Sequence, residues 1–473
     1  MSPPLTVAAI ARSLAAGECS ALEIADGCLR RIDETDAAVK AWSRLCADRA
    51  RREAAASDAR RARGAARGLL DGVPFGVKDI IDTEGVETTC SADLLAGNVP
   101  QTDATTVARL RAAGAVMLGK VNTQPFAYGV TTPPTRNPWN LDHVPGGSSG
   151  GSGAAVAARQ VPFALGTDTG GSIRIPAALN GVTGLRPTFG RVPKDRTAVV
   201  GYSLDTVGPL CLTAEDAGSV LNAIAGYTPD DPSAARVPPM DFTADLAAAG
   251  DARPLQGLRV GLMGGYFTSR FPDVTEAVRA AAAVLEQLGA SVRDIPAPTV
   301  DGIAPHVPGF AVRMPEAAAW HAGRIRRQED DYPPITVRLV RPGDFILATD
   351  YINGRRYRRR YGTVMRRLYD DFDVTITPTV PAPAVRQGET HYHSPDGFEE
   401  ELVFGTIRCT FPFSLTGQPV LTVPCGFTAN ALPVGLQIAG RPWAEATILR
   451  VGHAFQQATD WHDRRPPAGA VLD

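Results

Sequence analysis

The sequence predicts an α/β fold: a single large domain built on a mixed, twisted central β-sheet with helices on both faces. Two observations support this prediction. Residues 73–77 form a short apolar, β-prone run, and a helical pattern at 103–113 leads directly into a second apolar run at 115–118. The same alternation returns later in the chain, with strand character at 258–263 and a helical pattern at 274–288. Strands that alternate with helices are typical of α/β domains.

Helices are expected to open the chain. Ser20 and Glu23 have the spacing of a capping box, in which each side chain satisfies a backbone amide of the other residue. The Ala/Arg/Asp-rich run 47–67 predicts an exposed helix of mixed charge. Further strands are expected at 372–377 and 420–424. The organisation that follows is a helical N-terminal region (1–67), a core (68–225), a Pro-rich loop or linker (226–255) and a C-terminal half (256–473), in which segment 298–405 is expected to line the pocket.

The composition is that of an ordinary globular protein, with 44% hydrophobic and 21% charged residues among 473. Because 48 basic residues face 50 acidic ones, we expect no nucleic-acid partner and no membrane surface, and a homodimer stays open. The seven cysteines are scattered and contain no C-x-x-C pair, and no apolar run approaches the roughly 20 residues of a membrane helix. A cytoplasmic location is therefore expected. No cluster such as H-E-x-x-H is present, so neither a metal nor a cofactor is expected.

Glycine and serine dominate segment 145–153, PGGSSGGSG. A flexible linker is disfavoured because an apolar helix is expected directly afterwards, at 154–159. Residues 146–150 fit the G-x-S-x-G elbow with Ser148 as nucleophile, but that elbow needs a preceding strand, and 137–145 contains two prolines. A phosphate-binding loop lacks its Gly-Lys-Ser/Thr ending. Residues 114–120 match G-x-x-x-x-G-K by accident, because Val121 lacks the hydroxyl that would hold magnesium.

A second glycine-rich segment, GTDTGGSIRIP at 166–176, ends on a different candidate nucleophile. Two glycines before Ser172 free backbone N–H groups to point at a substrate oxygen, as in an oxyanion hole. A serine nucleophile needs a base. The seven histidines form no motif, whereas Lys78 ends an apolar strand, where desolvation favours a neutral amine. A salt bridge with Asp79 is the structural alternative for Lys78.

Three motifs together resemble the amidase signature family: GVKD at 76–79, GSSGGS at 147–152 and DTGGSIR at 168–174, followed by GLRPT at 184–188. Their order and spacing match the family, with Ser148 placed 24 residues before Ser172, and 432–442 resembles the family's closing strand. The resemblance implies that Ser172 attacks the carbonyl and that Ser148, after a cis peptide bond, relays the proton to neutral Lys78. It also implies an oxyanion hole formed by backbone amides, and a set of side chains that hold the loop. The amides are those of Thr169, Gly170, Gly171 and Ser172, and the side chains are Ser149, Asp168 and Arg174.

The resemblance implies an amidase that cleaves the carbon–nitrogen bond of a small amide, anilide or carbamate through a seryl acyl-enzyme, with esters or carbamates as side substrates. One alternative is the glutaminase-type subunit of a tRNA-dependent amidotransferase. That subunit needs partner chains and a basic residue for the glutamine carboxylate, and the region where the family places this residue diverges here, around 336–343. A non-catalytic interaction protein is disfavoured because all three catalytic positions are present. We therefore expect a small amide-like substrate.

Overall fold

The computed structural model describes residues 6–246 and 251–467. Its strands are β1 (Trp42–Leu45), β2 (Pro74–Lys78), β3 (Val116–Val121), β4 (Phe163–Asp168), β5 (Thr183–Arg186), β6 (Thr206–Cys211), β7 (Arg259–Met263), β8 (Ser291–Ile295), β9 (Val374–Pro378), β10 (His391–His393), β11 (Glu399–Glu401), β12 (Val420–Phe427) and β13 (Pro433–Gly440). Its α-helices are α1 (Val7–Ala16), α2 (Ala21–Val39), α3 (Ala47–Arg61), α4 (Thr105–Ala112), α5 (Gly150–Ala157), α6 (Arg174–Asn180), α7 (Ala214–Ile224), α8 (Pro272–Gln287), α9 (His306–Gln328), α10 (Pro334–Val340), α11 (Ala348–Asp371), α12 (Leu402–Ile407), α13 (Phe411–Thr416) and α14 (Glu445–Gln457).

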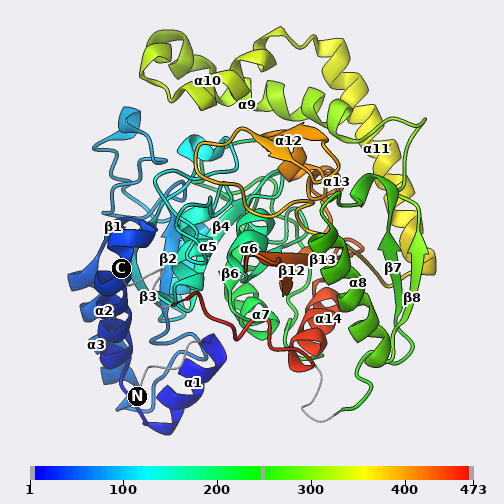
Figure 1. Ribbon diagram of the computed structural model, residues 1–473. Coiled ribbons are helices and arrows are strands. Elements are labelled where there is room, and N and C mark those ends of the chain that lie inside the picture. The colour runs from blue at the N-terminus through cyan, green and yellow to red at the C-terminus, as the bar shows by residue number, and fades with distance from the viewer. Residues whose placement is uncertain (1–5, 247–250, 468–473) are drawn as a thin grey trace.

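A single large sheet runs through the molecule (Figure 1). Its eleven strands follow the order β1-β3-β2-β4-β6-β5-β12-β13-β9-β7-β8. β2 lies parallel to β3 and β4, and β7 lies parallel to β8 and β9, whereas the remaining neighbours are antiparallel. Strands from both sides of segment 226–255 join in this sheet, and that segment contains no helix or strand among its described residues. The predicted single α/β domain with a mixed sheet is therefore confirmed.

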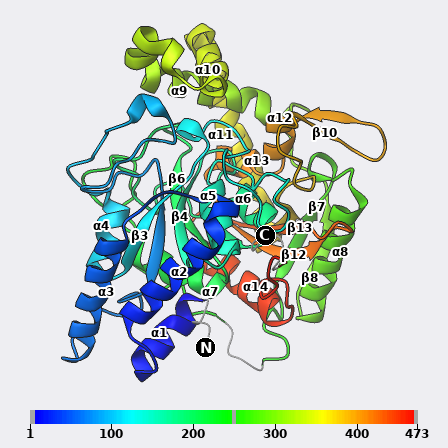
Figure 2. The same ribbon diagram turned by 60° about the vertical axis from the view of Figure 1, so that its left-hand side comes forward.

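Helices flank the sheet on both faces (Figures 1 and 2). α5 and α6 pack against each other, α5 contacting β4 and α6 contacting β5, β12 and β13. α14 packs against α7 and α8 as well as against β12 and β13. α9 and α10 form a cap at the top of both views, and α11 leads from this cap back to β9. Among the helices of the described ranges, none is long and apolar enough to cross a membrane.

The first helices begin where the sequence predicts. The capping box of α2 is present: the Ser20 amide donates to Glu23 at 2.8 Å, and the Glu23 amide donates to the Ser20 hydroxyl at 3.1 Å. The helix expected at 47–67 ends earlier, at Arg61. Gly64 follows with φ 68°, a left-handed conformation that suits glycine and does not continue a helix. Propensity alone overestimated the length of this helix.

The glycine-rich segment 145–153 is buried and is not a linker. Its helix starts at Gly150, four residues before the expected 154. A Cβ at Gly151 would lie 2.5 Å from the backbone nitrogen and oxygen of Asn122, so only glycine permits this close approach. Over the described residues, the last strand before the segment is β3, which ends at Val121, so the elbow hypothesis lacks its preceding strand. Lys120 lies within β3 and donates to the hydroxyl of Thr88 at 3.0 Å, which explains it as a buried structural lysine.

Candidate active site

Lys78 is the last residue of β2 and is fully buried. Its ammonium donates to three hydroxyl groups: Ser148 at 2.7 Å, Ser149 at 2.9 Å and Thr167 at 2.8 Å. Asp79, its neighbour, lies 3.9 Å from Lys120 instead. The predicted burial of Lys78 and its contact with Ser148 are therefore present, and the salt bridge with Asp79 is not formed.

Burial lowers the pKa of Lys78 from 10.5 to about 7, and the nearby Asp168, Asp205 and Cys90 only partly oppose this effect. An amine with a pKa near 7 is neutral in about half of the molecules at neutral pH. A neutral lysine can accept a proton, which a charged one cannot. The site therefore provides a group with the properties of a general base at physiological pH.

Ser148 and Ser172 lie on two loops that meet beside Lys78. The peptide bond before Ser148 is cis, and the Ser149 amide donates to the Ser172 carbonyl at 3.1 Å, which joins the two loops. Ser172 is partly buried and lines a cavity, whereas Ser148 is fully buried. The two serine hydroxyls do not hydrogen bond to each other in the described structure. A proton relay between them thus requires a side-chain rotation at one of the two serines.

Four consecutive backbone amides, those of residues 169–172, follow the end of β4 and precede α6. Within the described residues, none of these amides donates a hydrogen bond to the protein. Gly171 has φ 136°, and a Cβ there would lie 2.3 Å from the Thr410 hydroxyl, so the loop requires glycine at this position. Free amides beside a serine that lines a cavity have the arrangement needed to hold an oxyanion.

Asp168 anchors this loop from below. Its carboxylate pairs with Arg174 at 2.9 Å and with Arg186 at 2.9 Å, and all three side chains are fully buried. Burial alone would raise the pKa of Asp168, but the two guanidinium groups hold it well below its usual range. Arg174 also donates to Ser414 and to Gln437, at 2.7 and 2.6 Å. The sequence indicated Asp168 and Arg174 but missed Arg186, although Arg186 belongs to the quoted GLRPT motif.

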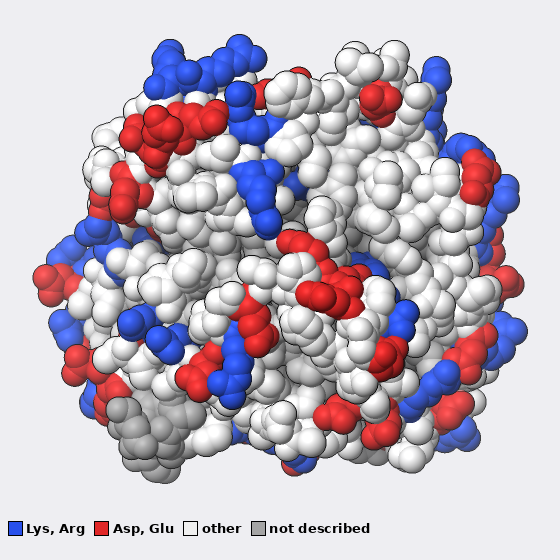
Figure 3. Space-filling view, turned by 45° about the horizontal axis from the view of Figure 1, so that its top comes forward, with Lys and Arg blue, Asp and Glu red and all other residues white. Residues whose placement is uncertain are grey.

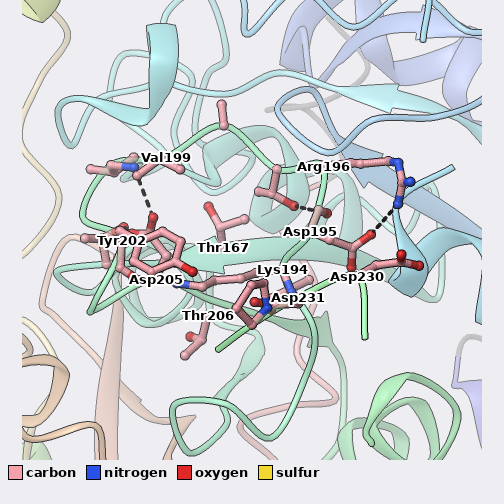
Figure 4. A pocket seen from close by; sticks show the side chains of 16 residues that line it. Thr167, Lys194, Asp195, Arg196, Val199, Tyr202, Asp205, Thr206, Asp230 and Asp231 are labelled. Atoms are coloured by element: carbon pink, nitrogen blue, oxygen red, sulfur yellow. Dashed lines mark hydrogen bonds and ion pairs between the residues drawn. The ribbon is translucent and has the colours of Figure 1, made fainter. Parts of the chain in front are cut away.

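Thr167 and Asp205 are two further site residues that the sequence analysis missed. Thr167 contacts Lys78, and Asp205 accepts a hydrogen bond from the Thr169 hydroxyl at 2.5 Å, which orients the first residue of the amide loop. Both line a second cavity of about 380 Å³, shown in Figure 4 together with Lys194 and Asp195. Thr167 precedes Asp168 in the second glycine-rich segment, so its position was visible in the sequence, whereas Asp205 comes from the next loop.

The cavity that holds Ser172 is mostly apolar. The segment 298–405, which the sequence predicts to line the pocket, contributes Phe310, Arg313, Leu339, Val403 and Phe404 to it. No histidine is among its lining residues in the described chain. Arg341, in the divergent region 336–343, lies away from this cavity and pairs with Glu329 at 3.0 Å and with Asp344. On the face shown in Figure 3, charged side chains of both signs are scattered between uncharged areas.

The comparisons with known proteins agree with this geometry. The family model Amidase matches residues 23–449. The chain is 43% identical over 492 residues to a glutamyl-tRNA(Gln) amidotransferase subunit from Roseiflexus castenholzii (strain DSM 13941 / HLO8), covering 98% of this chain and 97% of that protein. It is 41% identical over 464 residues to an amidase of Pseudomonas putida, covering 98% and 97%. A solved structure, described with a vestigial protein complex and the origins of an s-triazine catabolic enzyme, has a TM-score of 0.89 at 35% identity and covers 95% of this chain and 98% of that chain.

The chain therefore belongs to the amidase family, and the resemblance to the amidase signature family is confirmed. It is a hydrolase of carbon–nitrogen bonds. One expectation is wrong, namely a small amide-like substrate with no nucleic-acid partner, because a relative that matches nearly the whole chain is named as a subunit of an enzyme acting on glutamyl-tRNA(Gln). The physical reason is that a net charge of -2, taken over 473 residues, does not describe any single surface.

Proposed function

We propose that this chain hydrolyses the side-chain amide of glutamine as the amidase subunit of a tRNA-dependent amidotransferase. The observation that supports this proposal best is the 43% identity to such a subunit over nearly the full length of both chains. The sequence-based objection was the missing basic residue at 336–343. Arg313, from a different part of the chain, places a guanidinium in the cavity of Ser172 and removes that objection.

The proposed reaction uses the groups around Lys78. Neutral Lys78 takes the Ser172 proton through Ser148 while the Ser172 oxygen attacks the amide carbon, and the amides of residues 169–172 hold the oxyanion. The proton then passes to the leaving nitrogen, the carbon–nitrogen bond breaks, and ammonia departs from an acyl-enzyme. Water, deprotonated by the same base, hydrolyses the ester and releases glutamate. Ser149 and Thr167 hold Lys78, and Asp168 with Arg174 holds the loop.

A surface on α11 suits the phosphate backbone of a tRNA. A groove of about 810 Å³ there is lined by six arginines: Arg355, Arg356, Arg358, Arg359, Arg360 and Arg366. Only Arg360 among them forms an ion pair within the described residues, with Asp301. Arginine clusters of this kind bind phosphates and give salt-dependent affinity. A cytoplasmic location, which the seven free cysteines also suit, belongs to the same proposal.

The test is glutamine hydrolysis by the purified chain, alone and together with the partner subunits of an amidotransferase. We expect glutamate release in the complete complex, ammonia transfer to glutamyl-tRNA(Gln), and loss of both in Ser172→Ala. Failure to hydrolyse glutamine in the complete complex, with a Ser172 that is still labelled by a fluorophosphonate, would contradict the proposal.

The second candidate is an amidase that works without partner subunits. The 41% identity to the Pseudomonas putida amidase over 98% of this chain favours it. The same catalytic groups would serve both candidates, because only the acyl group and the fate of ammonia differ. Turnover of anilides, carbamates or esters by the chain alone, without hydrolysis of glutamine, would identify this second function.

A further inference from the structure

We propose that Arg313 is the carboxylate anchor of the substrate cavity, so that the enzyme selects amides with a carboxylate at the end remote from the scissile bond. This inference rests on the proposed function and names its substrate class. Arg313 lies on α9, and its side chain lines the same cavity as Ser172. The residue is only 7% exposed, and its Nε is buried with no hydrogen-bond partner.

The other buried arginines show why this is unusual. Arg174 and Arg186 pair with Asp168, and Arg191 pairs with Glu445 at 3.0 Å. In the described part of the chain, Arg313 alone among the four buried arginines has no carboxylate partner and no hydrogen bond. Because arginine stays charged in proteins, an unpaired buried guanidinium is costly unless a ligand supplies the opposite charge. A substrate carboxylate supplies it.

Two aromatic rings hold the Arg313 guanidinium in position. Its central carbon lies 5.6 Å from the centre of the Tyr128 ring and 5.3 Å from that of Phe310. Both rings also line the cavity. A guanidinium fixed between rings keeps its planar fork available for a bidentate contact with a carboxylate, at little further entropy cost. The nearby Asp205 carboxylate is occupied by the Thr169 hydroxyl and by the Val200 and Gly201 amides.

The same cavity has no acidic side chain among its lining residues in the described chain. It therefore offers nothing to pair with the α-ammonium group of glutamine. We infer that recognition depends on the carboxylate, and that glutaramic acid, which is glutamine without its amino group, is hydrolysed at least as well as glutamine. Pentanamide, which is neutral and of similar length, is the matched substrate without a carboxylate.

The experiment compares these three amides in the wild-type chain, in Arg313→Met and in the control Arg341→Met, each with its partner subunits. Arg313→Met is expected to lower kcat/KM for glutamine and glutaramic acid by about 30- to 3000-fold, the range for losing one member of a buried charge pair. Pentanamide turnover should change by less than about 3-fold. Arg341→Met should leave all three rates unchanged, because Arg341 is held at the surface by Glu329 and Asp344.

A second readout does not depend on turnover. Glutarate should protect Ser172 from fluorophosphonate labelling in the wild type and in Arg341→Met, and fail to protect it in Arg313→Met. If glutamine is not hydrolysed but glutarate protection depends on Arg313, the proposed function fails and the anchor stands. If Arg313→Met keeps both the preference for carboxylates and the protection by glutarate, the anchor is overturned whatever the complex does.

Discussion

Replacing Lys78 tests the catalytic base directly. A lysine with the ordinary pKa of 10.5 is neutral in about 0.03% of molecules at pH 7, whereas at a pKa of about 7 it is neutral in about half. Burial thus increases the amount of competent base by roughly a thousandfold. Because the neutral form is the active one, the rate should rise about tenfold per pH unit up to pH 7 and then level off. Lys78→Arg should lose about 10²- to 10⁴-fold, since arginine stays charged.

The assay is the rate of Ser172 labelling by a fluorophosphonate between pH 5 and pH 9, which needs the base but no known substrate. The matched control is Lys120→Met, which removes another fully buried lysine that contacts Thr83 and Thr88 rather than the two serines. It should destabilise the fold without moving the midpoint of the pH profile. A flat profile from pH 5 to pH 8, or Lys78→Arg labelled as fast as the wild type, would refute the role of Lys78.

Three further outcomes are expected. Ser172→Ala should lose labelling altogether, whereas Ser148→Ala should keep it at a rate about 10²- to 10⁴-fold lower, and an adduct on Ser148 in mass spectrometry would reverse the assignment. Asp168→Asn should lower the free energy of unfolding by about 3–5 kcal/mol in urea titrations, because two buried guanidinium groups lose their counter-charge, and an unchanged midpoint would contradict this. The double variant Arg355→Ala/Arg359→Ala should reduce the salt dependence of tRNA binding by about two units of slope, whereas an unchanged slope with weaker assembly of the complex would assign the groove to a protein partner.

The fold was predictable because its signals are local. Alternating strand and helix patterns, and the capping box of Ser20 and Glu23, depend on residues close in sequence, and the structure contains them. Segment ends were less predictable. α5 starts at Gly150 because tertiary packing against Asn122 and Thr132 admits only glycine there, although glycine is a poor helix former.

The centre of the site was predictable for the same reason, since each motif is contiguous in sequence. Residues that complete the site from elsewhere were not. Ser414 reaches Arg174 from 240 positions away, and Arg313 enters the cavity from a helix with no motif of its own. Only the folded chain shows that Arg313 lacks a counter-charge, because pairing between distant residues leaves no local pattern. The missing hydrogen bond between Ser148 and Ser172 is likewise a matter of side-chain rotation.

The cap formed by α9, α10 and α11 connects substrate choice with partner binding. Its inner side places Arg313 and Phe310 in the cavity, and its outer side presents the arginine groove of α11. α9 and α11 pack so closely at Gly354 that a Cβ there would lie 2.8 Å from the Pro308 carbonyl oxygen, so a shift of one helix displaces the other. Binding of an anionic partner on α11 can therefore change the position of the guanidinium that selects the substrate. Since the catalytic motifs lie outside this cap, the cap is where a chain of this family can acquire a different substrate while its chemistry stays the same.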